Sequence, residues 1–99
     1  MGPGSGGGRS WRGQESLRAP ADLTADRIID TVGLYCPIPI IRTAEAIAPM
    51  RTGEVLEVAS DDRVILLDMP AWCESTGHAY LGFREAGVAG EWRLFVRRK

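Results

Sequence analysis

The sequence has few of the residues on which metal centres and disulfide scaffolds depend. Its 99 residues include two cysteines, Cys36 and Cys73, and a single histidine, His78. There is no CxxC pair, and two cysteines are too few for the disulfide framework of a small secreted domain. The three residues also lack the paired spacing of a zinc finger. The sequence therefore predicts no metal, no cofactor and a reducing compartment, which we take to be the cytoplasm.

Long apolar runs and an excess of one charge are missing as well. No run of about 18 apolar residues is present, and the first residues contain no apolar signal-peptide core, so neither a membrane span nor secretion is predicted. Twelve Lys and Arg residues stand against 13 Asp and Glu, a net charge of −1. This balance argues against direct nucleic acid binding. Four basic residues gather near the end, and we interpret them as a solvated edge strand or, alternatively, a docking patch: Arg93, Arg97, Arg98 and Lys99.

The first 24 residues contain little that could be buried. They open with MGPGSGGGRS, and Gly- and Ser-rich segments of this kind behave as flexible coil. We expect residues 1–24 to form a disordered leader and residues 25–99 to form one domain. A domain of about 75 residues can still bury a single core.

The hydrophobic pattern of the domain predicts six elements. Strands are expected over residues 26–32, 54–59, 78–85 and 91–97. A helix is expected from residue 36 to 49, because apolar residues recur there at helical spacing: Ile40, Ile41, Ala44, Ile47 and Ala48. Residues 63–76 are ambiguous, since Val64 to Leu67 have strand propensity. We favour a second helix, with Met69, Trp72 and Cys73 on one face and Gly77 as its end.

This order predicts an α+β fold of the βαβαββ type. Two helices would pack on one face of a mixed four-stranded sheet, giving a two-layer α/β sandwich. The last two strands, joined by a Gly-containing turn, would form an antiparallel hairpin.

The stretch CPIP points to cysteine chemistry. If Cys36 is the N-cap, Pro37 is the first helical residue, where its fixed φ and missing N–H are tolerated. Pro37 and Pro39 remove two donors from the helix start, which leaves the N–H of Ile38 to face the sulfur. The helix dipole would then lower the pKa of the thiol. We expect an exposed thiolate at Cys36, with a buried, unreactive cysteine as the alternative.

A single exposed thiolate can attack a sulfane sulfur, hold it as a persulfide and pass it to another thiol. This chemistry needs a partner surface and no deep pocket. A second hypothesis is a non-enzymatic interaction or regulatory module, in which CPIP is a structural helix cap. A third is a redox sensor that pairs Cys36 with Cys73, which would require Cα atoms within about 7 Å.

Four further residues have both a structural and a functional interpretation. Cys73 is expected in the core, with a resolving thiol as the alternative. His78 is expected to be a hydrogen-bonded structural residue, with a proton shuttle as the alternative. Asp61 and Asp62 are interpreted as a turn or helix cap and not as paired catalytic carboxylates.

Taken together, several motifs resemble the TusA (SirA-like) sulfur-carrier family over residues 27–99. They are GLYCPIP at 33–39, GEVLEV at 53–58, the Asp pair at 61–62, DMPAW at 68–72, Gly77-His78 and the closing VRRK. The resemblance implies the same βαβαββ fold and a sulfurtransferase of the carrier type, with the persulfide on Cys36. It also implies loading by a cysteine desulfurase or other persulfide donor. Delivery would go to an acceptor protein in tRNA thiolation, molybdenum-cofactor or sulfur-metabolism relays.

The same resemblance assigns the neighbours of the cysteine. Pro37, Ile38, Pro39 and Gly33 take structural roles at the site. Tyr35 and Ile38 stand at positions that vary in the family and help to select partners. Further partner contacts are expected from three arginines: Arg42, Arg97 and Arg98. Arg63 stands where the family often has a proline. Of the implied functions, the resemblance therefore supports the assignment to tRNA thiolation least.

Overall fold

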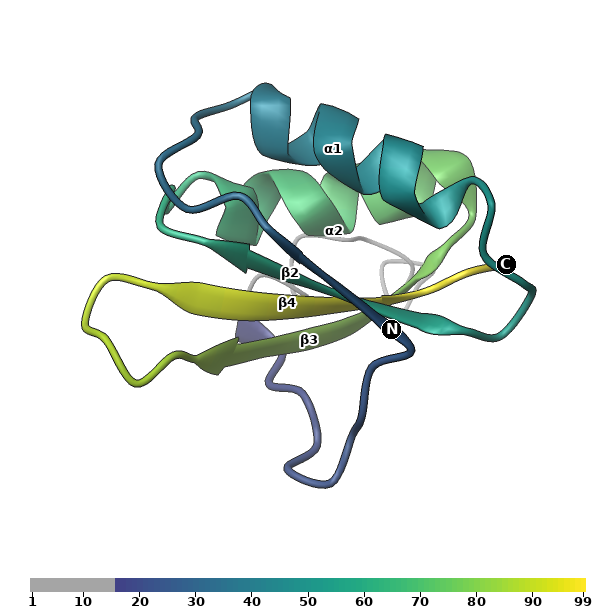
Figure 1. Ribbon diagram of the computed structural model, residues 1–99, viewed down its shortest axis with the longest axis horizontal. Coiled ribbons are helices and arrows are strands. Elements are labelled where there is room, and N and C mark those ends of the chain that lie inside the picture. Colours follow the sequence, from purple (N-terminus) through teal and green to yellow (C-terminus); the bar gives the residue numbers. More distant parts are fainter. Residues whose placement is uncertain (1–15) are drawn as a thin grey trace, which may run out of the picture.

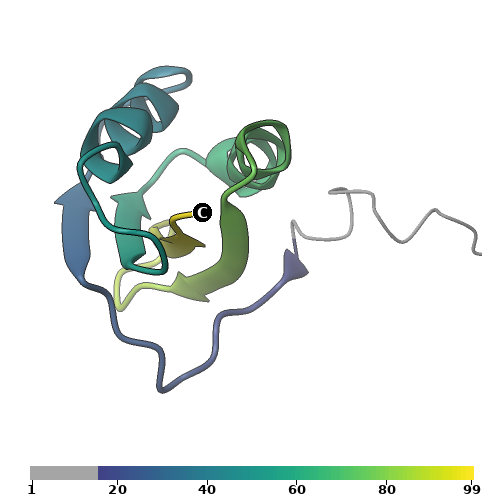
Figure 2. The same ribbon diagram turned by 90° about the vertical axis from the view of Figure 1, so that its right-hand side faces the viewer.

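Two helices cover one face of a four-stranded sheet, as the sequence predicts (Figures 1 and 2). The computed structural model describes residues 16–99. The elements follow in the order β1 (Arg27–Asp30), α1 (Ile38–Ile47), β2 (Val55–Ser60), α2 (Ile65–Thr76), β3 (Ala79–Glu85) and β4 (Trp92–Arg97). The predicted α+β sandwich of the βαβαββ type is confirmed.

The strands lie in the order β1-β2-β4-β3. β1 pairs in parallel with β2, and β4 is antiparallel to both of its neighbours. β4 is therefore an inner strand, and our interpretation of the basic C-terminal segment as an edge strand is wrong. Leu94, Phe95 and Val96 are all fully buried in it. Leu94 and Val96 pack in the main core, which continues beneath both helices.

α1 buries a different face from the one that its apolar residues predict. The buried residues are Pro39, Thr43, Ala46 and Ile47, and Ile41 is exposed. Thr43 tolerates full burial because its hydroxyl donates a hydrogen bond to the carbonyl oxygen of Pro39 at 2.8 Å. Counting apolar residues alone therefore misplaced the buried face by about one position, since a proline and a satisfied threonine take part in it.

α2 resolves the ambiguous segment as a helix that continues through Pro70. Met69 and Cys73 are buried on its inner face, and Trp72 packs partly against the core. The helix ends at Gly77, whose φ of +90° is the left-handed conformation that glycine adopts most readily. The predicted helix, its inner face and its end are confirmed.

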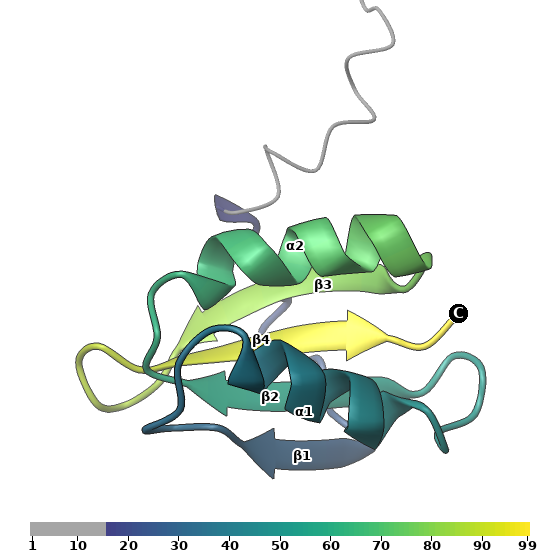
Figure 3. The same cartoon turned by 90° about the horizontal axis from the view of Figure 1, so that it is seen from above.

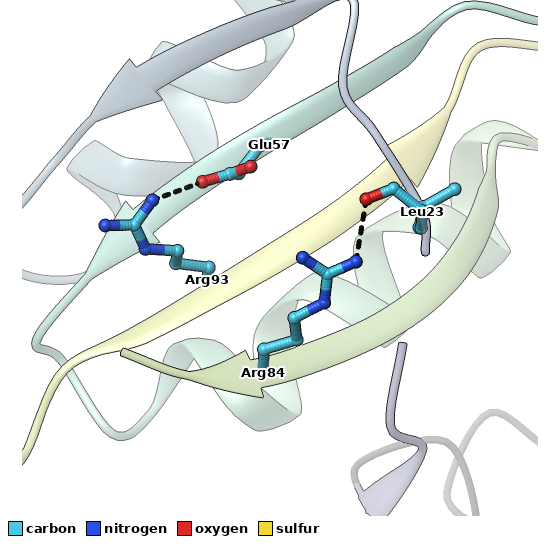
Figure 4. Close-up of polar contacts among 4 residues, drawn as sticks. All are labelled: Leu23, Glu57, Arg84 and Arg93. Carbon is cyan, nitrogen blue, oxygen red and sulfur yellow. Dashed lines mark hydrogen bonds and ion pairs between the residues drawn. The ribbon is translucent and has the colours of Figure 1, made fainter. Parts of the chain in front are cut away.

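Part of the predicted leader lies against the sheet, on the side away from the helices (Figure 2). Leu17 and Ala19 exchange backbone hydrogen bonds with Phe83 of β3, at 3.0 and 2.9 Å. Arg84 reaches across the sheet and donates to the carbonyl oxygen of Leu23 at 2.7 Å (Figure 4). We call residues 17–23 the N-terminal strap. Residues 1–15 lie outside the described part of the chain, so the leader as a whole stays a prediction.

Gly82 makes room for the N-terminal strap. Its φ is +110°, and a Cβ atom at this position would lie 2.6 Å from the backbone nitrogen of Ala19. Strand pairing is irregular at the same place, between Tyr80 and Gly82. The close approach of the two backbones therefore depends on the missing side chain.

A second arginine lies on this open face of the sheet. Arg93 of β4 donates to the carboxylate of Glu57 on β2 at 2.8 Å (Figure 4). The side chain of Glu57 is only 9% exposed, so its charge needs this partner. Arg93, which the sequence placed in a basic end segment, thus neutralises a buried carboxylate.

Candidate functional site

The candidate site forms where two loops meet at one edge of the sheet. β1 and β2 are parallel neighbours, so the loops that follow them leave the sheet at the same end. Side chains of the second loop fasten the first. Asp61 accepts a hydrogen bond from the N–H of Gly33 at 2.9 Å, and Asp62 accepts one from the N–H of Cys36 at 2.8 Å.

Asp62 also shapes the turn that leads into α2. Its second carboxylate oxygen accepts the N–H of Val64 at 3.1 Å, and its carbonyl oxygen accepts the N–H of Ile65 at 3.0 Å. One carboxylate therefore joins the cysteine loop to the start of the second helix. The turn alternative therefore fits the two aspartates, whereas the N-cap of α2 is Val64 and no side chain caps it. The structure adds their contact with the cysteine loop.

The helix start differs from the predicted one. α1 begins at Ile38 and its N-cap is Pro37, not Cys36. The N–H of Ile38 donates to the carbonyl oxygen of Tyr35 at 2.8 Å, so it does not face the sulfur. The carbonyl oxygen of Pro37 accepts the N–H groups of Ile40 and Ile41, both at 3.1 Å, and the Cys36–Pro37 peptide bond is cis. The predicted contact of the helix start with the sulfur is therefore wrong.

The thiol of Cys36 points instead toward α2. Its Sγ donates a hydrogen bond to Oδ2 of Asp68 at 3.0 Å. The pKa of the thiol is raised, first by this hydrogen bond, then by desolvation and by the negative charges of Asp68 and Asp62. The predicted lowering of the pKa is therefore wrong, because the hydrogen bond to Asp68, desolvation and the charges of Asp68 and Asp62 all favour the protonated thiol. Cys36 is exposed, as expected, and it carries its proton at neutral pH.

Asp68 is the site residue that the sequence analysis missed. It lies in the first turn of α2 and follows Cys36 by 32 positions in the sequence. The two helices are brought together only because β1 and β2 are adjacent and parallel, so that α1 and α2 run side by side in the same direction (Figure 3). Asp68 stands in the DMPAW motif, but nothing in that motif indicates a contact between its carboxylate and Cys36.

The structure places the other predicted contact residues at different ends of the molecule. Tyr35 is 68% exposed directly beside Cys36, and Ile38, the first residue of α1, is partly exposed. Arg42 is exposed on α1 and forms a loose ion pair with Glu45 at 3.9 Å. Tyr35 and Ile38 thus lie at the thiol end of α1, and Arg42 lies near its middle.

Arg97 and Arg98 lie at the opposite end. Arg97 pairs with Val55, at the start of β2, whereas the Cys36 loop follows the carboxyl end of the neighbouring strand. Arg98 donates to the carbonyl oxygens of Ile47 and Ala48 at 3.2 and 3.3 Å, so it caps the C-terminal end of α1. The length of α1, about 15 Å, separates this end from Cys36.

Cys73 and His78 are not brought to Cys36. Cys73 is a free thiol buried in the core, and burial raises its pKa to about 12. His78 follows the far end of α2. Its Nδ1 accepts the N–H of Lys99 at 3.1 Å, and its ring lies 5.2 Å from that of Trp72. Burial and the charges of Lys99 and Arg98 lower the pKa of His78. Both positions fit the structural interpretation.

Within residues 16–99, no group of three or more His, Cys, Asp or Glu side chains is arranged to hold a metal ion. In the same part of the chain, no helix has the length and apolar character to cross a bilayer.

Comparison with known proteins identifies a family. The model of the family described as sulfurtransferase TusA matches residues 27–98. A sulfur carrier protein TusA from Pseudomonas entomophila is 33% identical over 78 residues, which are 79% of this chain and 95% of the relative. A putative sulfur carrier protein, YrkF, from Bacillus subtilis is 40% identical over 65 residues. That match covers 66% of this chain, and the chain spans only 35% of YrkF.

The solved structures agree on the fold. A SirA-like protein from Desulfitobacterium hafniense superposes with a TM-score of 0.63 at 26% sequence identity. The match covers 72% of this chain and 95% of the other. The family match begins at residue 27, and the N-terminal strap therefore lies outside it.

Proposed function

The chain belongs to the sulfurtransferase TusA family, and on that premise we propose that it carries sulfane sulfur as a persulfide on Cys36. The observation that carries the proposal is the position of this thiol. It is exposed, at the end of a loop whose backbone two carboxylates fasten to the next loop. A fastened and accessible sulfur suits exchange between two protein surfaces, which requires access and no enclosed pocket.

The proposed reaction conserves the number of sulfur atoms and electrons. The Cys36 sulfur attacks the outer sulfur of a donor persulfide, a new S–S bond forms at Sγ, and the donor S–S bond breaks. The donor leaves as a thiol and the carrier becomes Cys36–S–SH. Delivery repeats the exchange with an acceptor thiol, so the protein returns to its starting state.

We propose a cysteine desulfurase, or another protein that bears a persulfide, as the donor. The acceptor would be a protein thiol in tRNA thiolation, in molybdenum-cofactor synthesis or in another sulfur-metabolism relay. Because two free cysteines are typical of a reducing compartment, the proposed setting is the cytoplasm. Exposed Tyr35 and Ile38 beside the thiol are the proposed partner contacts.

Intact-mass measurement tests this function. The protein is incubated with a cysteine desulfurase and cysteine, and then weighed without reductant. We expect a gain of one sulfur that is lost in Cys36→Ser and kept in Cys73→Ser. A gain that persists in Cys36→Ser would overturn the assignment to this residue.

One observation favours a second candidate, an interaction module in which the CPIP turn is purely structural. The Cys36 thiol is hydrogen-bonded and its pKa is raised, which slows an unassisted thiol. This candidate predicts no sulfur gain from any of several persulfide donors. The same mass experiment therefore separates the two functions.

A further inference from the structure

The charges around Cys36 are of one sign. Asp68 of α2 accepts the thiol hydrogen bond, and Asp62 of the preceding turn accepts the N–H of Cys36. These two carboxylates are the charged groups that act on the sulfur. α1 contributes none, because its charged residues, Arg42 and Glu45, pair with each other.

The carboxylates beside the thiol also lack a cation of their own. In the part of the chain that the structure describes, the ion pairs join Arg18 to Glu85, Arg42 to Glu45 and Arg93 to Glu57. Asp62 and Asp68 therefore have no cationic partner among residues 16–99. Arg63, the basic residue of this turn, is exposed and forms none of these pairs. The negative charge at the thiol is left open to an approaching molecule.

We propose that Asp68 makes Cys36 selective for reaction partners that carry a cationic side chain next to their reactive sulfur. A Lys or Arg of the partner would pair with the Asp68 carboxylate as the two sulfurs meet. A partner with carboxylates around its sulfur would be repelled. Asp68 is thus a residue that determines partner choice, and this extends the proposed carrier function by naming the chemistry of the partner surface.

The same contact would prepare the sulfur for reaction. When the partner's cation pairs with Asp68, the carboxylate holds the thiol proton less strongly, and the proton passes to solvent. The thiolate of Cys36 then attacks the outer sulfur of the partner persulfide, and the partner's S–S bond breaks. The partner's sulfur leaves as a thiolate and takes up a proton from solvent, so no net oxidation or reduction occurs.

Small disulfides of different charge test the selectivity without any protein partner. Cystamine carries two positive charges, bis(2-hydroxyethyl) disulfide carries none and 3,3′-dithiodipropionate carries two negative charges. Each forms a mixed disulfide with Cys36 and releases one thiol, and mass spectrometry locates the adduct. The measured quantity is the ratio of the rate with cystamine to the rate with the dianion. Because the thiolate fraction of the protein enters both rates, it cancels in this ratio.

For the wild type at low salt we expect a strong preference for cystamine. Asp68→Asn should reduce the ratio by about five-fold or more, since one charge at about 4 Å contributes about 1 kcal/mol even in water. Raising the ionic strength should reduce the wild-type ratio toward that of the variant. Asp68→Glu, which keeps the charge, should keep the preference.

Glu74→Gln is the matched control. It removes the same charge from an exposed position of α2, six residues and about 9 Å further along the helix. The ratio should remain that of the wild type. An unchanged ratio in Asp68→Asn, or an equal fall in Glu74→Gln, would overturn the inference. Circular dichroism of each variant verifies the fold, and Asp68→Glu provides a second reading if Asp68→Asn is unstable.

The two experiments can overturn the inference and the proposed function independently of each other. Sulfur gain on Cys36 without charge preference overturns the inference and leaves the carrier function. Charge preference in a protein that no persulfide donor loads supports the inference and overturns the carrier function.

Discussion

The Cys36 thiol donates a hydrogen bond to the Asp68 carboxylate across 3.0 Å, although Cys36 lies in the loop before α1 and Asp68 lies in α2. The contact exists because the sheet places α1 and α2 side by side with their N-terminal ends together (Figure 3). It reverses the direction in which a helix start alone would shift the pKa of the thiol. The resting form of the protein is therefore a protonated thiol.

Asp68→Asn is expected to lower the pKa of Cys36, because it removes the main cause of the raised value. The thiolate is the reactive form, so the pH profile of alkylation by iodoacetamide should move to lower pH. At a pH below the pKa of both proteins, a thiol whose pKa is lower by one has about ten-fold more thiolate. The rate rises by less than this factor, about three-fold, because a less basic thiolate is also less nucleophilic. The measurement is the alkylation rate from about pH 6 to about pH 10. Glu74→Gln should retain the wild-type profile, and a coincident profile in Asp68→Asn would contradict the assigned cause.

Asp62→Ala is expected to loosen the cysteine loop. It removes the acceptor of the Cys36 and Val64 N–H groups, whereas Asp61→Ala removes the acceptor of Gly33. Amide hydrogen exchange by NMR should become faster at Cys36 in the first variant and at Gly33 in the second. Each variant should lose about 1 kcal/mol of unfolding free energy. Equal exchange changes at both amides in both variants would show that the two aspartates do not act separately.

The buried Cys73 is expected to make the protein sensitive to alkali. Its pKa is raised to about 12 in the folded state by burial, so the unfolded chain releases this proton at lower pH than the folded one does. Cys73 alone should lower the free energy of unfolding by about 1.4 kcal/mol per pH unit as pH rises from the ordinary thiol value toward 12. Cys36 and the buried Tyr80, whose pKa values are also raised, add to this fall.

Urea unfolding at a series of pH values measures this slope. Cys73→Ala should show a shallower slope between about pH 9 and 11, even though the cavity it leaves lowers stability at every pH. Cys36→Ser should also make the slope shallower, because the folded-state pKa of Cys36 is raised as well, so the two single variants measure the contribution of each thiol. A slope that Cys73→Ala leaves unchanged would exclude Cys73 as its source.

Gly82→Ala is expected to release the N-terminal strap. The new Cβ would meet the backbone of Ala19 at 2.6 Å, and the residue would have to keep a φ of +110°. We expect a loss of about 1 to 3 kcal/mol and faster tryptic cleavage after Arg18. Gly87→Ala is the control, because a Cβ there meets nothing within 4 Å. Cleavage at the wild-type rate in Gly82→Ala would show that the strap does not depend on this contact.

The sequence predicted the elements and their layers because these depend on local patterns. Gly77 ends α2 through its own left-handed conformation, and the alternation around Leu94 indicates a strand whatever its neighbours are. The position of β4 inside the sheet could not be predicted in this way. It depends on which strands pair, and nothing in residues 92–97 records that choice.

The same distinction applies to the site. Exposure of Cys36 followed from its prolines, which hold it at a turn before the helix. The state of its proton did not, because it depends on Asp68, a residue of another helix. Arg98 is a second example. The sequence predicted a partner contact at this residue, but its side chain binds carbonyl oxygens at the C-terminal end of α1. Chemistry that depends on two elements needs the packing of both.

The inner position of β4 also affects how the protein assembles. The β1-α1-β2 unit leaves one side of β2 without a strand, and β4 is the one strand of the four-stranded sheet that pairs with β3 in the described part of the chain. The β1-α1-β2 unit and β3 are joined into one sheet only when β4 pairs between β2 and β3. We therefore expect the domain to fold in one cooperative step, without a stable partly folded form. A chain cut in the turn at residues 86–91 should accordingly remain incomplete until a separate peptide with the sequence of β4 is added.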